Sequence, residues 1–310
     1  MGKSNNKKII NIILATLATV ILIFSFVITY FPSLGLPSWS QLFQKAGLTN
    51  YVDSRKYDFS AHYIDIGQGD CELIISGDDV VLIDSGDIGS FSKIKSYLDF
   101  QGIKSIDYFI LTHPHSDHIG SASEILASYE VENVIMPRYS EQHTPTTEIY
   151  KQLVISLNQS KTKVIAAKAG ECYELKNFSF IVLSPTKEYD ELNNSSVVIK
   201  CIHKNNSFLF CGDAEKKAEK DIINSGYDIS ADVIKLGHHG SYTSSSSKFM
   251  MAVNPKYAVI SCGKNNKYNH PNQPVLDFLI KHNIDYKRTD FNGTIVAVSD
   301  GKDITFFEER

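Results

Sequence analysis

The feature that most constrains this sequence is an uncharged run of 23 residues, from Ile9 to Phe31. As a helix rising about 1.5 Å per residue, the run is about 35 Å long, which exceeds the roughly 30 Å hydrocarbon core of a bilayer. A buried core helix is the alternative, but the helices of globular proteins seldom run this long without a charged residue. We therefore predict one N-terminal transmembrane helix.

The residues that flank this run predict its orientation. Lys3, Lys7 and Lys8 precede it, and cytoplasmic flanks are enriched in basic residues, so residues 1–8 are expected in the cytoplasm and the chain after about residue 32 outside. The run continues into Pro32 and not into small residues of the A-x-A type, which favours a retained anchor over a cleaved signal peptide. The predicted organisation is a tail 1–8, an anchor 9–31, a linker 32–56 and a folded domain 57–310.

The composition is that of a globular catalytic chain. Hydrophobic residues make up 43% of the 310 residues, which is enough for a core without disulfide support. The 31 Lys and Arg residues against 35 Asp and Glu residues exclude histone-like proteins that wrap polyanions. Five scattered cysteines without a C-x-x-C pair argue against a disulfide framework and a cysteine zinc site. We expect most of them to be buried thiols.

After residue 57, short apolar runs alternate with helical stretches, which predicts a mixed α/β fold. The predicted strands are 59–66, 71–76, 79–84, 107–112, 133–137, 163–166, 178–183, 196–203, 207–212, 232–236, 256–262, 284–288, 294–298 and 303–307. The predicted helices are 90–101, 118–130, 146–159, 214–224, 245–253 and 273–282.

Four potential metal ligands follow the strand 107–112 within six residues, namely His113, His115, Asp117 and His118. Imidazole and carboxylate groups suit zinc and other first-row divalent ions. A turn between a strand and a helix can aim neighbouring side chains at two points, so one cluster can serve two metals. A helix N-cap explains Asp117 but none of the histidines.

Further candidate ligands lie at other strand ends, where chemistry is often placed. Asp213 closes an apolar run and can bridge a metal pair, or it can act as the N-cap of helix 214–224. His238 and His239 lie in a glycine-flanked turn, and one of them is expected to be a ligand. Asp84 is expected to accept a hydrogen bond from a ligating imidazole, with a turn-forming role as the alternative.

These residues together resemble a metallo-β-lactamase-fold hydrolase, specifically the extracytoplasmic domain of the ComEC competence-protein family. The resemblance implies an αββα sandwich with a dinuclear site on one edge. In the family, however, this domain is appended to many membrane spans, whereas one predicted span precedes it here. The motifs that carry the resemblance are 63–70, 82–86, 113–120, 193–198, 210–213, 231–241, 257–261, 268–271 and 288–295.

The resemblance also implies roles for individual residues. His113 and His115 would hold metal one, Asp117, His118 and His239 would hold metal two, and Asp213 would bridge them. The choice of His239 over His238 rests on similarity to teichoic-acid phosphorylcholine esterases. Many superfamily members supply a third histidine to metal one where this chain has Asn193, an expected weak ligand that makes Mn²⁺ an alternative to Zn²⁺.

The expected reaction is attack by hydroxide on a phosphodiester, because two divalent ions can generate hydroxide at neutral pH. His238, His270 and donors around Ser241 are expected to steady charge on the departing group, although His270 could be an ordinary loop histidine. Nucleic acid is the leading substrate, a cell-wall phosphodiester is the alternative, and a non-catalytic tethered binding module is the second alternative. The acidic balance argues against an extended DNA-binding surface. A local basic patch could line the site or be scattered, and its members are Lys264, Lys267, His270, Lys281, Lys287 and Arg288.

Overall fold

The computed structural model describes residues 2–30, 42 and 51–309. Most of the predicted linker therefore lies outside the described residues. By the density of internal contacts the chain divides into two compact units, Met1–Tyr51 and Val52–Arg310. Each unit is described by itself.

The first unit contains one long helix, α1 (Gly2–Tyr30). Its stretch Ile10–Thr29 has a mean hydropathy of 2.7 and is long and apolar enough to cross a membrane. The hydroxyls of Thr16 and Thr19 donate to the carbonyls of Ile12 and Ala15, each at 2.9 Å. These polar groups are satisfied within the helix, as a lipid environment requires. The predicted transmembrane helix is thus present as a candidate membrane span.

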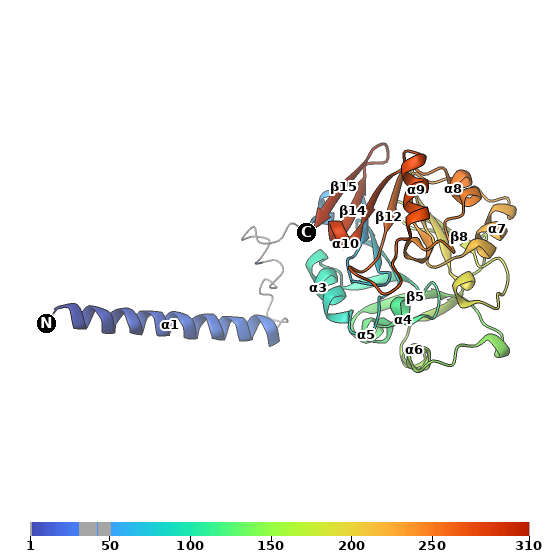
Figure 1. Ribbon diagram of the computed structural model, residues 1–310. Coiled ribbons are helices and arrows are strands. Elements are labelled where there is room, and N and C mark those ends of the chain that lie inside the picture. The colour runs from blue at the N-terminus through green and yellow to red at the C-terminus, as the bar shows by residue number, and fades with distance from the viewer. Residues whose placement is uncertain (1, 31–41, 43–50, 310) are drawn as a thin grey trace. The chain divides into compact units, whose positions relative to one another are not determined.

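The second unit is built on two β-sheets (Figure 1). The eight-stranded sheet runs in the order β15-β14-β1-β2-β3-β4-β5-β6. Its strands are β1 (Phe59–Tyr63), β2 (Glu72–Ser76), β3 (Asp79–Ile83), β4 (Ser105–Ile110), β5 (Glu130–Met136), β6 (Lys163–Ala166), β14 (Thr294–Ser299) and β15 (Ile304–Glu309). The strands β3 to β6 are parallel to one another, so their carboxyl ends lie along one edge.

The seven-stranded sheet runs in the order β13-β12-β11-β10-β9-β8-β7. Its strands are β7 (Cys172–Glu174), β8 (Ser179–Ser184), β9 (Val198–His203), β10 (Asn206–Phe210), β11 (Val233–Lys235), β12 (Tyr257–Ile260) and β13 (Asp285–Arg288). The strands β10 to β13 are again parallel. Each sheet therefore offers one parallel half whose strand ends can carry functional loops.

Helices cover the outer faces of both sheets (Figure 1). Those beside the eight-stranded sheet are α3 (Phe91–Gln101), α4 (Ser116–Ile119), α5 (Ala122–Ser128) and α6 (Glu148–Gln159). Those beside the seven-stranded sheet are α7 (Lys216–Asn224), α8 (Ser247–Val253) and α9 (Gln273–Lys281), and the short α10 (Thr289–Asn292) follows β13. The architecture is the predicted αββα sandwich.

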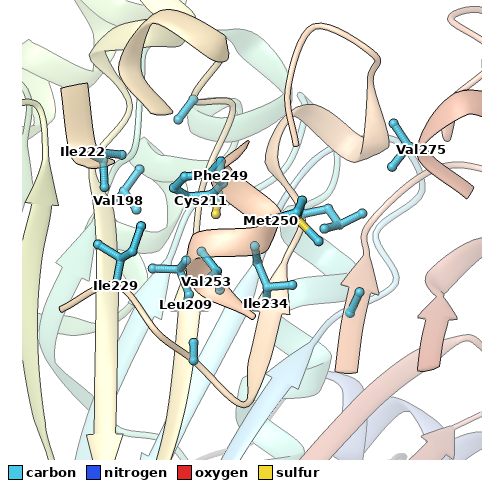
Figure 2. Packing of buried hydrophobic residues seen from close by; sticks show 14 of the residues in the cluster. Val198, Leu209, Cys211, Ile222, Ile229, Ile234, Phe249, Met250, Val253 and Val275 are labelled. Atoms are coloured by element: carbon cyan, nitrogen blue, oxygen red, sulfur yellow. The ribbon is translucent and has the colours of Figure 1, made fainter. Parts of the chain in front are cut away.

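Two apolar cores hold these layers together. Between the sheets, Tyr63 stacks on Phe210 with ring centroids 5.8 Å apart, and both rings are buried. The second core lies between the seven-stranded sheet and its helices, and Figure 2 shows Phe249 and Met250 of α8 among the residues around Leu209. Burial of a large apolar side chain stabilises a fold by about 1.5–3 kcal/mol. Four of the five cysteines are buried, as predicted, and Cys172 is exposed.

The main differences from the predicted elements have local causes. The predicted helix 118–130 is divided into α4 and α5, because the backbone leaves the helical conformation at Ser121, with φ −111° and ψ 12°. The preceding Gly120 packs against the backbone of Asp87, where an added Cβ would lie 2.4 Å from the Asp87 carbonyl carbon. The predicted helix 214–224 begins only at Lys216, with Glu215 as its N-cap. Asp213 is therefore free of the capping role. The three-residue strand β7 was too short to be predicted.

Candidate metal centre

The candidate ligands converge where parallel strands of both sheets end. His113, His115, Asp117 and His118 follow β4, Asp213 follows β10, and the turn 237–240 follows β11. The loop 64–71 passes close beneath them, since the amide of Asp70 donates to the carbonyl of Asp117 at 3.1 Å. An added Cβ on Gly69 would lie 2.3 Å from that carbonyl oxygen, so only glycine permits this approach.

Asp213 occupies the middle of the cluster. Its Oδ1 lies 3.3 Å from His118 Nε2 and 3.7 Å from His239 Nε2. Its Oδ2 lies 3.7 Å from His113 Nε2 and 3.7 Å from His238 Nε2. The two oxygens of one carboxylate therefore face two different pairs of imidazoles.

The remaining predicted ligands stand on either side of this carboxylate. His115 Nδ1 lies 3.0 Å from His113 Nε2, and Asp117 Oδ2 lies 3.3 Å from His239 Nε2. Two of the groups of atoms close enough to hold one ion are His113, His118 and Asp213, and Asp117, His118 and His239. The structure thus brings together the six predicted ligands, which are His113, His115, Asp117, His118, Asp213 and His239.

The buried polar atoms of the centre indicate that the residues fit divalent cations. His118 Nε2, His239 Nε2, Asp213 Oδ1 and Asn193 Oδ1 are buried, and none of them makes a hydrogen bond. A buried polar atom without a partner costs free energy, and a cation coordinated by such atoms removes the cost. The donor set of imidazoles and carboxylates is the one that zinc and manganese use.

Carboxylates behind two of the histidines fix their tautomers. Asp84 Oδ2 lies 2.6 Å from His118 Nδ1, and Asp84 is itself held by the amide and hydroxyl of Thr112 at 2.7 and 2.6 Å. His239 Nδ1 lies 3.0 Å from the Ser261 carbonyl and 3.1 Å from Asp70 Oδ1. In the neutral form of each ring, these contacts place the proton on Nδ1, so that Nε2 can offer a lone pair to a cation beside Asp213.

A buried ammonium supports the second of these contacts. Lys235 Nζ donates to Asp70 Oδ2 at 2.8 Å, and both side chains are at most 2% exposed. Burial acts to raise the pKa of Asp70, but Lys235 and then His239 hold it at about 2. Burial and the Asp70 charge raise the pKa of the nearby Glu72 well above its ordinary value. Asp70 therefore stays ionised, while burial and the Asp70 charge oppose ionisation of Glu72.

The electrostatics of the cluster favour a cation. Burial opposes ionisation of Asp213, but the charges of His118 and His239 hold its pKa well below the ordinary value. Burial lowers the pKa of His118, yet Asp213 and Asp84 raise it well above the usual value. Without a metal, the carboxylates are thus compensated by protons on imidazoles, and a divalent ion can replace those protons.

A cavity of about 440 Å³ opens onto the centre. Its lining includes His115, Asp117, Asp213, Gln68, Tyr268 and His270. Burial, followed by the charges of His239 and His238, lowers the pKa of His270 to about 4. His270 is therefore neutral at neutral pH and can donate one hydrogen bond.

The remaining predicted residues fall in different places. Asn193 lines the cavity, with Oδ1 free and Nδ2 3.4 Å from Glu215 Oε1. Ser241 is buried behind the turn, where its hydroxyl bonds that of Thr243 at 3.0 Å, and it is absent from the cavity lining. Ser241 thus does not stand where a donor to substrate would, because its hydroxyl is used to shape the turn.

The proposed basic patch does not gather at the cavity. Of its six members only His270 lines the cavity. Lys287 pairs with Glu308, and Arg288 pairs with Asp290 at 2.7 Å. These acidic neighbours neutralise the charges of Lys287 and Arg288, whose partners could not be predicted from the sequence.

Sequence reasoning gave no role to Asp70, Lys235, Glu215 or Gln68. One signal was present for Lys235, since a lysine within the apolar strand β11 needs a buried partner. Gln68 Oε1 accepts a hydrogen bond from the Gly263 amide at 3.1 Å. Its Nε2 is buried and has no hydrogen-bond partner.

Comparison with known proteins agrees with this geometry. The model of the metallo-beta-lactamase superfamily matches residues 64–264. The chain is 35% identical over 251 residues to ComE operon protein 3 of Bacillus subtilis (strain 168), covering 75% of this chain and 32% of that protein. It is 29% identical over 272 residues to Competence protein ComA of Neisseria gonorrhoeae, covering 84% of this chain and 36% of that protein. The chain thus spans about a third of the length of these relatives.

A solved structure shows the same fold. The metallo-beta-lactamase fold protein YhfI from Bacillus subtilis has a TM-score of 0.50 and 13% identity, covering 74% of this chain and 96% of that chain. The chain belongs to the metallo-β-lactamase superfamily, whose members are typically metal-dependent hydrolases. The predicted resemblance to competence proteins is confirmed by the named relatives.

Proposed function

We propose that this chain is a membrane-anchored, extracytoplasmic phosphodiesterase that uses two divalent metal ions, with nucleic acid as its leading substrate. The observation that supports it is the position of Asp213, whose two oxygens face separate pairs of imidazoles. A carboxylate placed in this way can bridge two cations, as in two-metal hydrolases.

Each ion would have its own set of ligands beside the shared Asp213. His113, His115 and Asn193 would hold metal one. Asp117, His118 and His239 would hold metal two. Mixed nitrogen and oxygen donors suit Zn²⁺, with Mn²⁺ as the alternative.

The bound ions would supply hydroxide at neutral pH and polarise the ester under attack. The chain's own residues would bind and orient the substrate. The neutral His270 can donate a hydrogen bond to a phosphoryl oxygen, and Gln68 lines the same cavity. Donors fixed before the reaction stabilise developing negative charge without reorganisation.

Two observations support nucleic acid over other phosphodiesters. Tyr268 lines the cavity, is 50% exposed and stacks on His270 with ring centroids 5.6 Å apart. Bases stack on exposed aromatic rings of this kind, at about 1–3 kcal/mol per base. One relative is named a competence protein, which supports a DNA-related substrate.

The anchor and its orientation complete the proposal. Helix α1 carries the apolar stretch Ile10–Thr29, and the lysines before it favour a cytoplasmic N-terminus. Protease added to intact cells or to right-side-out vesicles is expected to digest the catalytic domain, and complete protection would contradict the orientation.

The activity is tested by metal analysis of the full-length protein in detergent, together with hydrolysis of bis(p-nitrophenyl) phosphate, single- and double-stranded DNA and choline-phosphate esters. Metal-dependent DNA cleavage that is lost in Asp213→Ala and kept in the surface variant His143→Ala is the expected result. Cleavage of choline-phosphate esters alone would replace the nuclease by the cell-wall alternative. A protein that binds no metal and cleaves nothing would leave the tethered binding module.

A further inference from the structure

The two consecutive histidines of the turn 237–240 lie on opposite sides of the bridging carboxylate. His239 Nε2 faces Asp213 Oδ1, the oxygen that also faces His118. His238 Nε2 faces Asp213 Oδ2 at 3.7 Å, the distance at which His113 Nε2 faces the same oxygen. His238 thus faces the same carboxylate oxygen as His113, while His239 faces the same oxygen as His118.

The backbone of the turn produces this division. His238 has φ 50° and ψ 46°, and His239 has φ 54° and ψ 27°. Left-handed backbone is unfavourable for residues with a Cβ, at roughly 1–2 kcal/mol each. Two successive residues of this kind persist only where the surrounding structure holds them. Here they direct two adjacent imidazoles at one carboxylate, with ring planes 66° apart.

The far side of the His238 ring is held as firmly as that of the other proposed ligands. His238 Nδ1 lies 3.0 Å from Thr243 Oγ1 and 3.2 Å from Glu215 Oε1. Asp84 stands in the same relation to His118, and Asp70 to His239. A carboxylate behind Nδ1 is the usual support of a metal-ligating histidine, because it fixes the tautomer and raises the basicity of Nε2.

The surroundings of the His238 ring differ from those expected for the charge-steadying role predicted from the sequence. Nδ1 faces Thr243 Oγ1 and Glu215 Oε1, and Nε2 faces Asp213 Oδ2. A phosphoryl oxygen beside Nε2 would meet the Asp213 carboxylate, whereas a cation there would be shared with it. The orientation therefore fits a metal ligand better than a substrate contact.

The same carboxylate also holds the weak ligand of metal one. Asn193 Nδ2 donates to Glu215 Oε1 at 3.4 Å, and Asn193 Oδ1 has no hydrogen-bond partner. Glu215 therefore positions both side chains on the side of His113 and His115. Where other members of the superfamily use a third histidine, this chain offers an amide oxygen together with His238.

We propose that His238 is a ligand of metal one, so that the pair His238 and His239 is divided between the two ions, with Glu215 as the positioning residue of His238. This inference rests on the proposed two-metal site. In that site, His238 would take the place of the third histidine that many superfamily members supply to metal one.

The test is the metal stoichiometry of the full-length protein in detergent, measured by elemental analysis after loading with Zn²⁺ and by electron paramagnetic resonance after loading with Mn²⁺. The parent is expected to bind two equivalents, with a spin-coupled Mn²⁺ pair. His238→Ala is expected to bind one equivalent and to show the signal of an isolated Mn²⁺. His282→Ala, a histidine on the surface, is the matched control and should keep two.

Double variants identify the ion that is lost. His238→Ala with His115→Ala should still bind one equivalent, because both remove ligands from the same ion. His238→Ala with His239→Ala should bind none. Glu215→Gln keeps the fold contacts of the side chain and should weaken one of the two Mn²⁺ equivalents about 10–100-fold.

A His238→Ala protein that keeps two equivalents with unchanged affinity would overturn the inference and leave the proposed function standing. A double variant His238→Ala with His115→Ala that binds no metal would also overturn the inference. A parent protein that binds no metal would instead refute the proposed function. Unfolding temperatures of the chelated variants show whether any loss reflects misfolding.

Discussion

Replacement of Lys235 by methionine should destabilise the folded domain more than loss of a surface charge does. Lys235 and Asp70 are at most 2% exposed, and their 2.8 Å contact joins β11 of the seven-stranded sheet to the loop before β2. Methionine fills a similar volume but carries no charge, so Lys235→Met leaves the Asp70 carboxylate buried without its cation. His239 Nδ1 still lies 3.1 Å from Asp70 Oδ1, but the Lys235 ammonium has the larger influence in keeping the pKa of Asp70 low.

The expected magnitude follows from the burial. Removing one partner of a buried ion pair costs about 3–5 kcal/mol, because the remaining charge is uncompensated. In a domain of this size, 1 kcal/mol shifts the unfolding temperature by about 2–4 °C, so a decrease of about 6–20 °C is expected. The double variant Lys235→Met with Asp70→Leu should recover most of the loss, since no isolated charge remains.

The assay is thermal and urea unfolding of the full-length protein, followed by circular dichroism after removal of metal with a chelator. Lys256→Met is the matched control, because Lys256 pairs with Asp232 at 2.9 Å but is 72% exposed. That pair should contribute about 0–1 kcal/mol. If Lys235→Met unfolds within about 1 kcal/mol of Lys256→Met, the argument from the buried pair is wrong.

Three further changes have defined outcomes. Asp213→Ala should weaken both metals, and an Asp213→Ala protein that retains two equivalents would refute the bridging role. Asn193→His should raise the affinity of the metal-one site and shift its preference from Mn²⁺ toward Zn²⁺ in a competition titration, since imidazole is the better zinc ligand. An unchanged metal preference would exclude Asn193 from the site. Burial raises the pKa of Glu309 to about 7 from an ordinary value of 4.5, although Val52 and Tyr97 donate to it. An acid whose pKa is raised by folding contributes stability that is lost as the pH rises from about 4.5 to 7, here about 3 kcal/mol. Glu309→Gln should therefore flatten that part of the stability profile, and an unchanged slope would contradict this reasoning.

The sequence predicts which candidate ligands come together because of where those residues occur. His113 and Asp213 each follow an apolar run, and the carboxyl ends of parallel strands meet along one edge of a sandwich. The type and order of the elements follow from hydrophobic periodicity. The boundaries were less accurate where tertiary contacts ended an element early, as at Gly120.

The directions of the side chains could not be predicted in the same way. His238 and His239 both adopt left-handed backbone. Histidine adopts this conformation more often than most residues do, but the preference is too weak to predict the direction of each ring from the sequence. The burial of Lys235 depends on Asp70, which is 165 positions away in the sequence. Such contacts are properties of the assembled sandwich and of no local pattern.

The charge of the chain bears on how it could act on a polyanion. Beyond residue 8 the chain carries 28 basic and 35 acidic residues, and the described lysines and arginine of the predicted patch do not line the cavity. Without a metal, the imidazoles around Asp84 and Asp213 balance those carboxylates, and Lys235 balances Asp70. Two divalent ions would add net positive charge at the centre, because bound cations are the largest charges in such a site. Binding of a phosphodiester analogue should therefore depend on metal loading more strongly than on salt concentration, and affinity that falls steeply with salt but survives chelation would show that surface lysines, and not the metal centre, attract the substrate.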